Sequence, residues 1–230
     1  MPPALSPFFW LHFNNLVGTW TNVKNKEIEI EGMKIEEVNS PKYLGTIMIA
    51  DNLIEEEIKE RIAAGNRSFF ANKKIFQSKL ITRKTKERLY YMVIRPVVVY
   101  GSECWVLTEN IKQKLLVFER RLLKIIFGST QKTNEEMEKL INYENIVRHI
   151  KSKRLSWVGH VERMPDERVV KSIYKWKPHA TRLKGRPRLR WDDDVRDDLR
   201  QTGVNNWKQN AQERKPWRGI IEQAKTLKEL

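Results

Sequence analysis

Apolar side chains recur every three or four positions through three successive stretches of the chain, the spacing typical of amphipathic helices. The first stretch covers about 51–79, and Asp51 or Asn52 is placed to cap its start. The third begins near Glu109 and ends at Gly128, a residue suited to a helix C-terminus. Their apolar faces are predicted to carry Ile54, Ile58, Ile62, Phe69, Ile75 and Phe76 in the first and Ile111, Leu115, Phe118, Leu122, Leu123 and Ile126 in the third.

The second stretch, 80–105, is predicted to form a helix that starts after Thr82, whose hydroxyl can accept an amide of the first turn. We expect a bend or stop near Arg95, because Pro96 lacks an amide proton and clashes with the preceding turn. Its predicted apolar stripe comprises Leu89, Met92, Val93, Pro96, Val97 and Tyr100. Three helices with short connections predict an antiparallel bundle over 51–128.

Before the bundle, residues 27–36 alternate polar and apolar side chains around Gly32, a pattern that predicts a β-hairpin within 26–50. Residues 38–49 favour a third extended piece, broken by Pro41 and Gly45. Proline, asparagine and glycine punctuate residues 1–25, so a loosely ordered lead-in is expected there.

The remainder, 129–230, predicts a basic helical region. Thr133 and Glu136 match a capping box for a short helix through Leu140, and a longer helix is expected from about Glu144 to Val161. An extended arm, about 175–190, holds two prolines and one glycine and precedes an amphipathic helix from Trp191. One or two short helices should follow, with Trp207, Ala211, Trp217 and Ile221 facing inward. The predicted fold class is mainly α.

Charge narrows the partners that the chain is expected to have. The 230 residues contain 44 Lys and Arg against 29 Asp and Glu, for a net charge of +15. Phosphate backbones and anionic membrane surfaces are the usual partners of such an excess. No apolar run is long enough to span a bilayer and no secretory signal is recognisable, so we expect an intracellular protein without a membrane partner.

Two groups of residues are candidates for nucleic-acid binding. Cations at the start of the second helix oppose its macrodipole, so a passing polyanion explains them as well as a solvated charged face does. The first group lies in the helices and comprises Arg67, Lys73, Lys74, Arg83, Lys84, Lys86 and Arg88. The second lies in and beside the arm and comprises Arg182, Lys184, Arg186, Arg188 and Arg190, with Trp176 and Trp191 placed to stack on bases.

Five arm cations that neutralise five phosphates would give a log–log salt slope of about −4 on duplex. A nuclear-localisation-like or solubilising tract is the alternative reading of the same residues. Buried anchors are the alternative reading of the tryptophans, and Trp105, Trp157, Trp207 and Trp217 occupy core-like positions.

Candidate catalytic and metal-binding residues are few. Asp192, Asp193 and Asp194 are adjacent on a predicted helix, so they point about 100° apart and are better explained by ion pairs with nearby arginines. His160 has no acid placed to orient it, and Cys104 is the only cysteine and is expected to be buried. We therefore predict no metal site and no cofactor.

Six motifs follow one another along the chain: Lys42-Tyr43-Leu44-Gly45, Ile62-Ala63-Ala64-Gly65-Asn66-Arg67, the run 95–105 from Arg95 to Trp105, the run 154–164 from Arg154 to Met164, Gly185-Arg186-Pro187-Arg188-Leu189-Arg190-Trp191, and Trp207 through Trp217. Together they resemble the segment that follows the palm in non-LTR retrotransposon reverse transcriptases, most closely the RTE-like endonuclease-reverse transcriptases. The resemblance covers roughly 27–226 in the family's order.

The resemblance implies a helical thumb laid on a template-primer duplex, followed by a C-terminal region that holds template RNA or target DNA. It also implies that polymerisation would need palm carboxylates holding two metal ions, and no Tyr-x-Asp-Asp-type motif precedes Tyr43. We therefore expect a truncated, non-enzymatic product that binds an RNA–DNA hybrid, RNA or DNA, with a nuclear location. The alternative is an inert remnant or a host-adopted interaction module.

Overall fold

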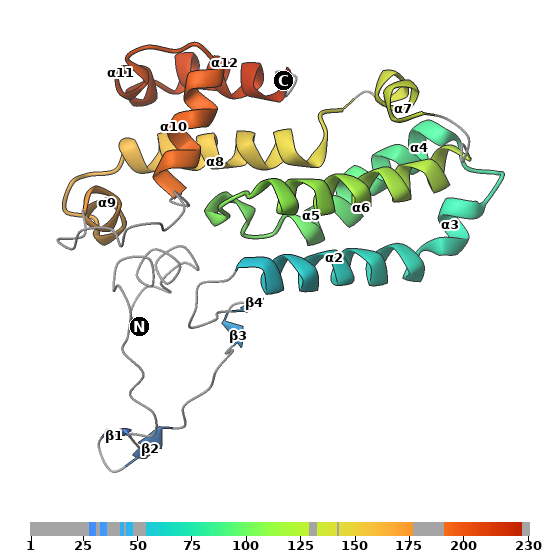
Figure 1. Cartoon of the computed structure of the whole chain (residues 1–230), viewed down its shortest axis with the longest axis horizontal. Coiled ribbons are helices and arrows are strands. Elements are labelled where there is room, and N and C mark those ends of the chain that lie inside the picture. Colours follow the sequence, from blue (N-terminus) through green and yellow to red (C-terminus); the bar gives the residue numbers. More distant parts are fainter. Residues whose placement is uncertain are drawn as a thin grey trace. The chain divides into compact units, whose positions relative to one another are not determined.

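The computed structural model describes residues 28–30, 33–35, 42–43, 45–47, 54–128, 133–141, 143–176 and 191–226. Over these residues the chain is mainly α, which confirms the predicted fold class (Figure 1). The expected lead-in at 1–25, the helix cap at Asp51 or Asn52, and the arm from 177 to 190 lie outside the described residues.

The described residues form two compact units. The first unit comprises residues up to Glu57 together with Met164–Pro187. Within it, β1 (Ile28–Ile30) pairs antiparallel with β2 (Met33–Ile35). This pairing confirms the predicted hairpin. A second small hairpin joins β3 (Lys42–Tyr43) to β4 (Thr46–Ile47), and Gly45 between them has φ +81°. The same unit contains helix α9 (Val169–Lys175).

The second unit, Ile58–Arg163 with the described residues from 191, begins in α2 (Ile54–Ala71). The single long helix predicted over 51–79 is wrong at Asn72, where the chain breaks before α3 (Lys73–Gln77). The Asn72 side-chain amide donates to the Ser68 carbonyl at 2.9 Å, a local bond that competes with helix continuation. Phe69 and Phe76 stack across this break, with ring centroids 4.7 Å apart.

The second predicted helix is a composite of α4 (Arg83–Leu89), a π-helical turn η1 (Tyr90–Ile94) and α5 (Arg95–Val98). The regular pattern breaks just before Pro96, as expected for a residue without an amide donor. The predicted apolar stripe is wrong, because Tyr90, Ile94 and Val98 face the core while Met92 and Tyr100 are exposed. This segment is apolar on nearly every side, so periodicity could not select the buried face.

Helix α6 (Glu109–Phe127) agrees closely with the prediction. Thr108 caps its start, Gly128 ends it in the left-handed conformation at φ +63°, and all six predicted apolar positions are buried. Both α3 and α4 contact α6, and Gly65 of α2 lies against Val98 and Phe118. The bundle core therefore forms among α2, the α4–α5 helix and α6.

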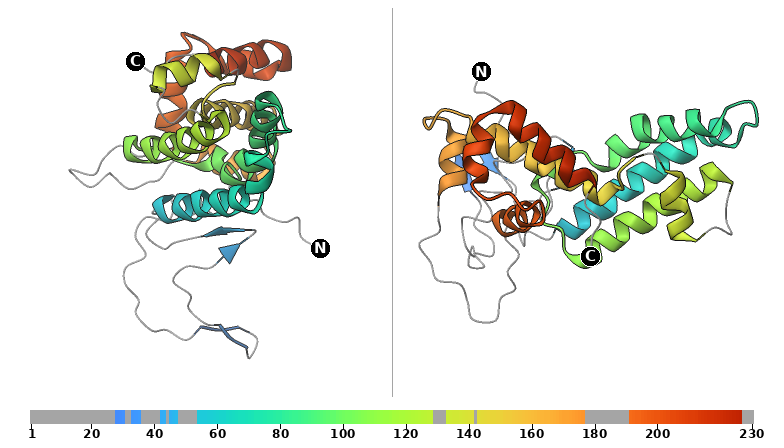
Figure 2. Two further views of the ribbon diagram at one scale, coloured as in Figure 1. Left: turned by 90° about the vertical axis from the view of Figure 1, so that its right-hand side faces the viewer. Right: turned by 90° about the horizontal axis from the view of Figure 1, so that it is seen from above.

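Helix α8 (Ile146–Glu162) contacts α6 and η2 (Ser102–Cys104), and it also contacts α10 (Trp191–Gln201), α11 (Trp207–Gln212) and α12 (Arg214–Thr226) (Figure 2). Packing thus continues between α6 and α8, across the division expected near residue 128. The short helix α7 (Asn134–Leu140) has the predicted capping box. In the parts of the chain described here, no helix has the length and apolarity needed to cross a bilayer.

Candidate nucleic-acid interface

A continuous run without acids supplies the strongest positive charge on the second unit. Residues 61–86 contain eight Lys and Arg and no Asp or Glu. Helix α3, the turn after it and the first residues of α4 lie in the second half of this run, and we call residues 73–88 the α3–α4 corner. Thr82 starts α4 as predicted, because its side-chain oxygen accepts the Thr85 amide at 3.2 Å.

The corner presents most of its predicted binding residues to solvent. Within the described residues none of the following five exposed side chains forms an ion pair: Lys73, Lys74, Arg83, Lys84 and Arg88. Arg67 is also exposed but donates to Glu60 at 2.7 Å, which partly neutralises it. With the exposed Lys79, the corner thus offers six uncompensated cations over sixteen consecutive residues, a density suited to a phosphate backbone.

Two predicted contacts are corrected by the structure. Lys86 lies on the row that continues through Tyr90 and Ile94 into the core and is only 8% exposed. Trp191 is 4% exposed and donates its indole N–H to the Glu103 carbonyl at 2.7 Å, so its ring cannot stack on a base. Trp176 keeps an exposed ring after α9. The five arm cations, Arg182 to Arg190, lie outside the described residues and stay a prediction.

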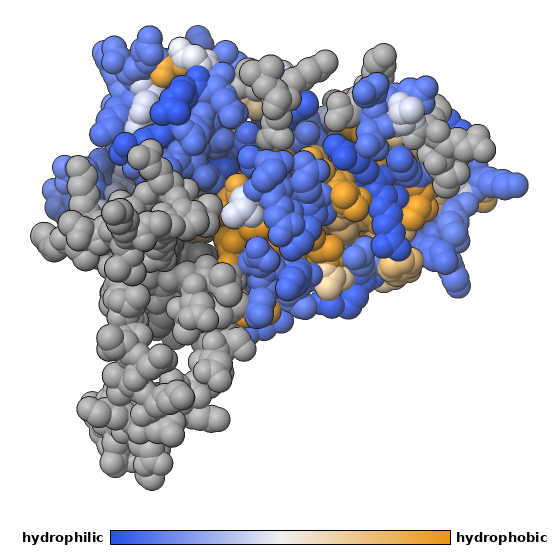
Figure 3. Space-filling view, in the orientation of Figure 1, coloured by the Kyte–Doolittle hydropathy of each residue, from blue (hydrophilic) through white to orange (hydrophobic). Residues whose placement is uncertain are grey.

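The corner occupies one end of the bundle. Figure 1 places α3, the start of α4 and the C-terminal end of α6 together there, and Arg121 and Lys124 lie in the last turns of α6. The face in Figure 3 is largely hydrophilic, with hydrophobic residues surfacing in the region of α2 and α6. Phe70 of α2 and Val117 of α6 are exposed apolar side chains.

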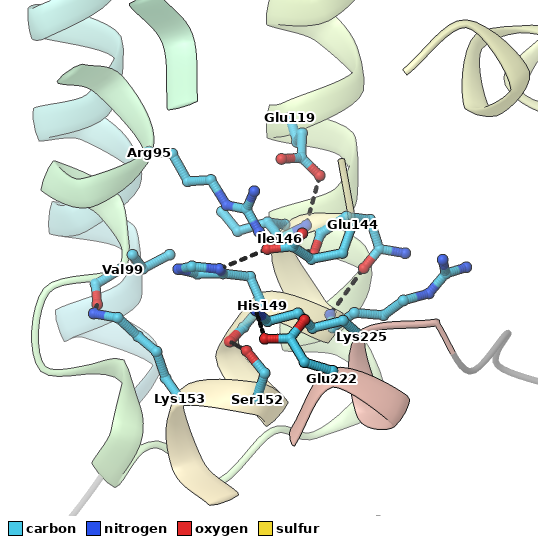
Figure 4. Close-up of polar contacts among 12 residues, drawn as sticks. Arg95, Val99, Glu119, Glu144, Ile146, His149, Ser152, Lys153, Glu222 and Lys225 are labelled. Atoms are coloured by element: carbon cyan, nitrogen blue, oxygen red, sulfur yellow. Dashed lines mark hydrogen bonds and ion pairs between the residues drawn. The ribbon is translucent and has the colours of Figure 1, made fainter. Parts of the chain in front are cut away.

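A buried polar network fixes the α4–α5 helix against α6 and α8. Glu119 of α6 accepts the Tyr90 hydroxyl at 3.1 Å and the Ile146 amide at 2.7 Å (Figure 4). Burial raises the pKa of Glu119, and the nearby Arg95 charge and these two hydrogen bonds oppose that rise. The bond to Ile146 also satisfies a free amide in the first turn of α8.

The network continues through Arg95, which donates to Glu144 at 3.1 Å and stacks over the Tyr91 ring at 5.0 Å. His149 Nδ1 lies 2.8 Å from the same Glu144 carboxylate. Partial burial would raise the pKa of Glu144, but the His149 hydrogen bond and the Arg95 charge lower that pKa to about 2. The sequence analysis missed this network, although a tyrosine and an arginine inside an apolar run are a usable signal for one.

A second buried ion-pair cluster joins α10 to α8. Arg154 is 1% exposed and pairs with Asp194 at 2.6 Å and Asp198 at 3.2 Å, and Lys151 lies 3.6 Å from Asp198. The predicted ion pairs of the aspartate run are confirmed for Asp192 with Arg196 and for Asp197 with Arg200, at 2.7 and 2.8 Å. The structure adds Arg154, a partner forty residues away that no local pattern could reveal.

The two other candidate residues, Cys104 and His160, lie in different surroundings. Burial and then the neighbouring Glu103 raise the pKa of the Cys104 thiol, as befits the buried cysteine that was predicted. His160 is exposed, with its ring 5.5 Å from that of Trp157. Among the described residues, no three His, Cys, Asp or Glu side chains gather in a way that could hold a metal ion.

Comparison with known proteins yields one informative similarity. No family model matches the chain, and no solved structure matches it. The chain is 25% identical over 201 residues to an uncharacterised transposon-derived protein of Caenorhabditis elegans, a match that covers 82% of this chain and 72% of the relative. This similarity supports an origin of the chain in a transposable element.

Proposed function

We propose that this transposon-derived chain binds the phosphate backbone of a nucleic acid, preferentially an RNA–DNA hybrid, through the α3–α4 corner. The observation that carries the proposal is the set of exposed, unpaired cations in the corner, all of which except Arg88 lie within the acid-free run 61–86. Cations at the start of α4 lie at the positive end of its macrodipole, so they cost the helix stability that a bound phosphate would return.

The resemblance to RTE-like reverse transcriptases supplies the identity of the polymer in this proposal. A thumb-like bundle contacts sugar and phosphate, so binding should depend on shape and charge, with little sequence preference. The basic tract at 182–190 adds further phosphate contacts and has the composition of a nuclear-localisation signal, so we place this activity in the nucleus. We assign the chain no catalysis of its own.

The test compares two variants that lose the same charge. R83A/K84A removes two exposed cations of the corner, whereas R196A/R200A removes two exposed arginines that are already ion-paired on α10. Fluorescence anisotropy of a labelled RNA–DNA hybrid, repeated at several salt concentrations, gives the log–log salt slope of each protein.

Loss of two phosphate contacts should make the slope of R83A/K84A shallower by about 1.8 than that of the wild type. R196A/R200A should keep the wild-type slope. Equal slopes for all three proteins would rule out the corner as the interface, and weak binding that is insensitive to salt would favour an inert remnant.

A further inference from the structure

A second group of cations gathers where α11 meets α12, far along the sequence from the α3–α4 corner. Residues 207–218 contain four cations and one acid, Glu213. Arg163, at the C-terminal end of α8, joins them through its Nη1, which donates to the Ala211 carbonyl at 2.7 Å. We call Arg163 with residues 207–218 the α11–α12 corner; its exposed cations are Lys208, Arg214, Lys215 and Arg218.

The like charges in this corner are close enough to disfavour one another. Partial burial and the neighbouring Arg214 guanidinium lower the pKa of Arg163. Within the described residues, Arg214, Lys215 and Arg218 form no ion pair, and Glu213 pairs with none of them. The ammonium of Lys208 lies 5.8 Å from the centre of the Trp207 ring. Helix stability does not explain this arrangement, since the first turn of α12 contains Arg214 and Lys215 and no acid.

The neighbouring helix α10 shows how the same unit treats cations that have a structural role. Its first turn is acidic, and both Arg196 and Arg200 are ion-paired within the helix. Lys225 in the last turn of α12 is likewise paired, with Glu222 at 2.8 Å. Only the cations of the first turns of α12 are unpaired, and this contrast indicates that they serve an external anion.

We propose that the α11–α12 corner is a second binding surface for the phosphates of a nucleic-acid backbone, separate from the α3–α4 corner. The two corners lie at different ends of the second unit, in the views of Figures 1 and 2. This proposal rests on the proposed function only for the kind of polymer that is bound. The observation of unpaired cations in the α11–α12 corner does not depend on the proposed function.

Lysine acetylation footprinting on the full chain tests this surface directly. At low salt a bound RNA–DNA hybrid should slow the modification of Lys208 and Lys215 several-fold, while Lys59, an exposed lysine of α2, should react at an unchanged rate. The protection should persist in R83A/K84A, which removes two cations of the other corner. Poly-glutamate of matched charge is the second probe, and protection equal to that given by the hybrid would overturn a phosphate-specific surface.

The pattern of protection separates the possible failures. Protection of Lys73 and Lys74 without Lys208 and Lys215 would overturn this inference and leave the α3–α4 corner standing. Absence of protection at all four lysines would overturn both proposals.

A variant measurement complements the footprint. R214A/K215A should make the log–log salt slope shallower by about 1.8 relative to the wild type, whereas R196A/R200A should not. Its melting temperature should be unchanged or higher, because two cations leave the positive end of α12. An unchanged slope in a folded R214A/K215A protein would contradict the second surface.

Discussion

At the scale of single residues, the buried side chain of Arg154 forms ion pairs with two aspartates of α10. Its guanidinium is buried between Asp194 and Asp198, and it also contacts the Trp105 carbonyl at 3.4 Å. Removing one partner of a buried pair leaves the other charge uncompensated, which costs more than the pair itself contributes.

R154M should therefore lower the free energy of unfolding by about 3–5 kcal/mol, as measured by urea denaturation. Adding D194N to R154M should restore part of this loss, because the Asp194 carboxylate stranded by the loss of Arg154 is then replaced by a neutral amide. A loss below about 1 kcal/mol in R154M would show that the cluster contributes little to stability.

Glu144 gives a prediction for pH. Its pKa is about 2 in the folded chain against an ordinary 4.5, so it contributes stability above pH 4.5 that is lost as the pH falls towards 2. E144Q should flatten the acid limb of stability against pH in this window. Glu119, whose pKa burial raises, contributes with the opposite sign in both proteins. Parallel acid limbs would contradict the assigned hydrogen bond and charge.

Residue-level prediction from the sequence succeeded where the determinant is local. Thr82, Gly128 and the Thr133 capping box were identified because each acts within four residues of its own position. Trp191 was misassigned because its partner, the Glu103 carbonyl, lies 88 residues away. The long-range partner decides whether a tryptophan is an anchor or a stacking platform.

At the scale of elements, α12 can cross closely over α8 because the residue at the crossing, Gly159, has no side chain. Trp217 lies directly over Gly159 and donates its indole N–H to the Leu155 carbonyl at 3.0 Å. A Cβ on Gly159 would overlap the indole ring, whereas one on Gly219 of α12 would meet no atom within 4 Å.

G159A and G219A should therefore change stability in opposite directions. G159A should destabilise the protein by about 1–3 kcal/mol through overpacking. G219A should stabilise it by about 0.5–1 kcal/mol, because alanine has the higher helix propensity. Thermal or urea unfolding of both variants checks this pair, and a stabilised G159A would contradict the α8–α12 contact.

The order of the elements was largely predictable because amphipathic periodicity, helix caps and helix-breaking residues are local features of the sequence. The α4–α5 helix was the exception. This helix is apolar on most sides, so its buried face is determined by the hydrogen bonds of Tyr90 and Arg95. Their partners, Glu119 and Glu144, lie later in the chain.

At the scale of the whole molecule, the second unit draws on residues from both sides of position 128. Because α8 contacts α6, η2 and α12, we expect this unit to unfold in one cooperative step. Differential scanning calorimetry with equal calorimetric and van't Hoff enthalpies for its transition would agree. Separate transitions for α2–α6 and for α8–α12 would contradict the continuous packing.

The central claim is that exposed, unpaired cations on this helical unit bind a phosphate backbone. The most direct measurement is the affinity of the full chain for two RNA–DNA hybrids of unrelated sequence, titrated over a range of salt concentrations. Both hybrids should give the same log–log slope, of about −4 or steeper. A flat salt dependence, or a strong preference for one sequence, would contradict the central claim.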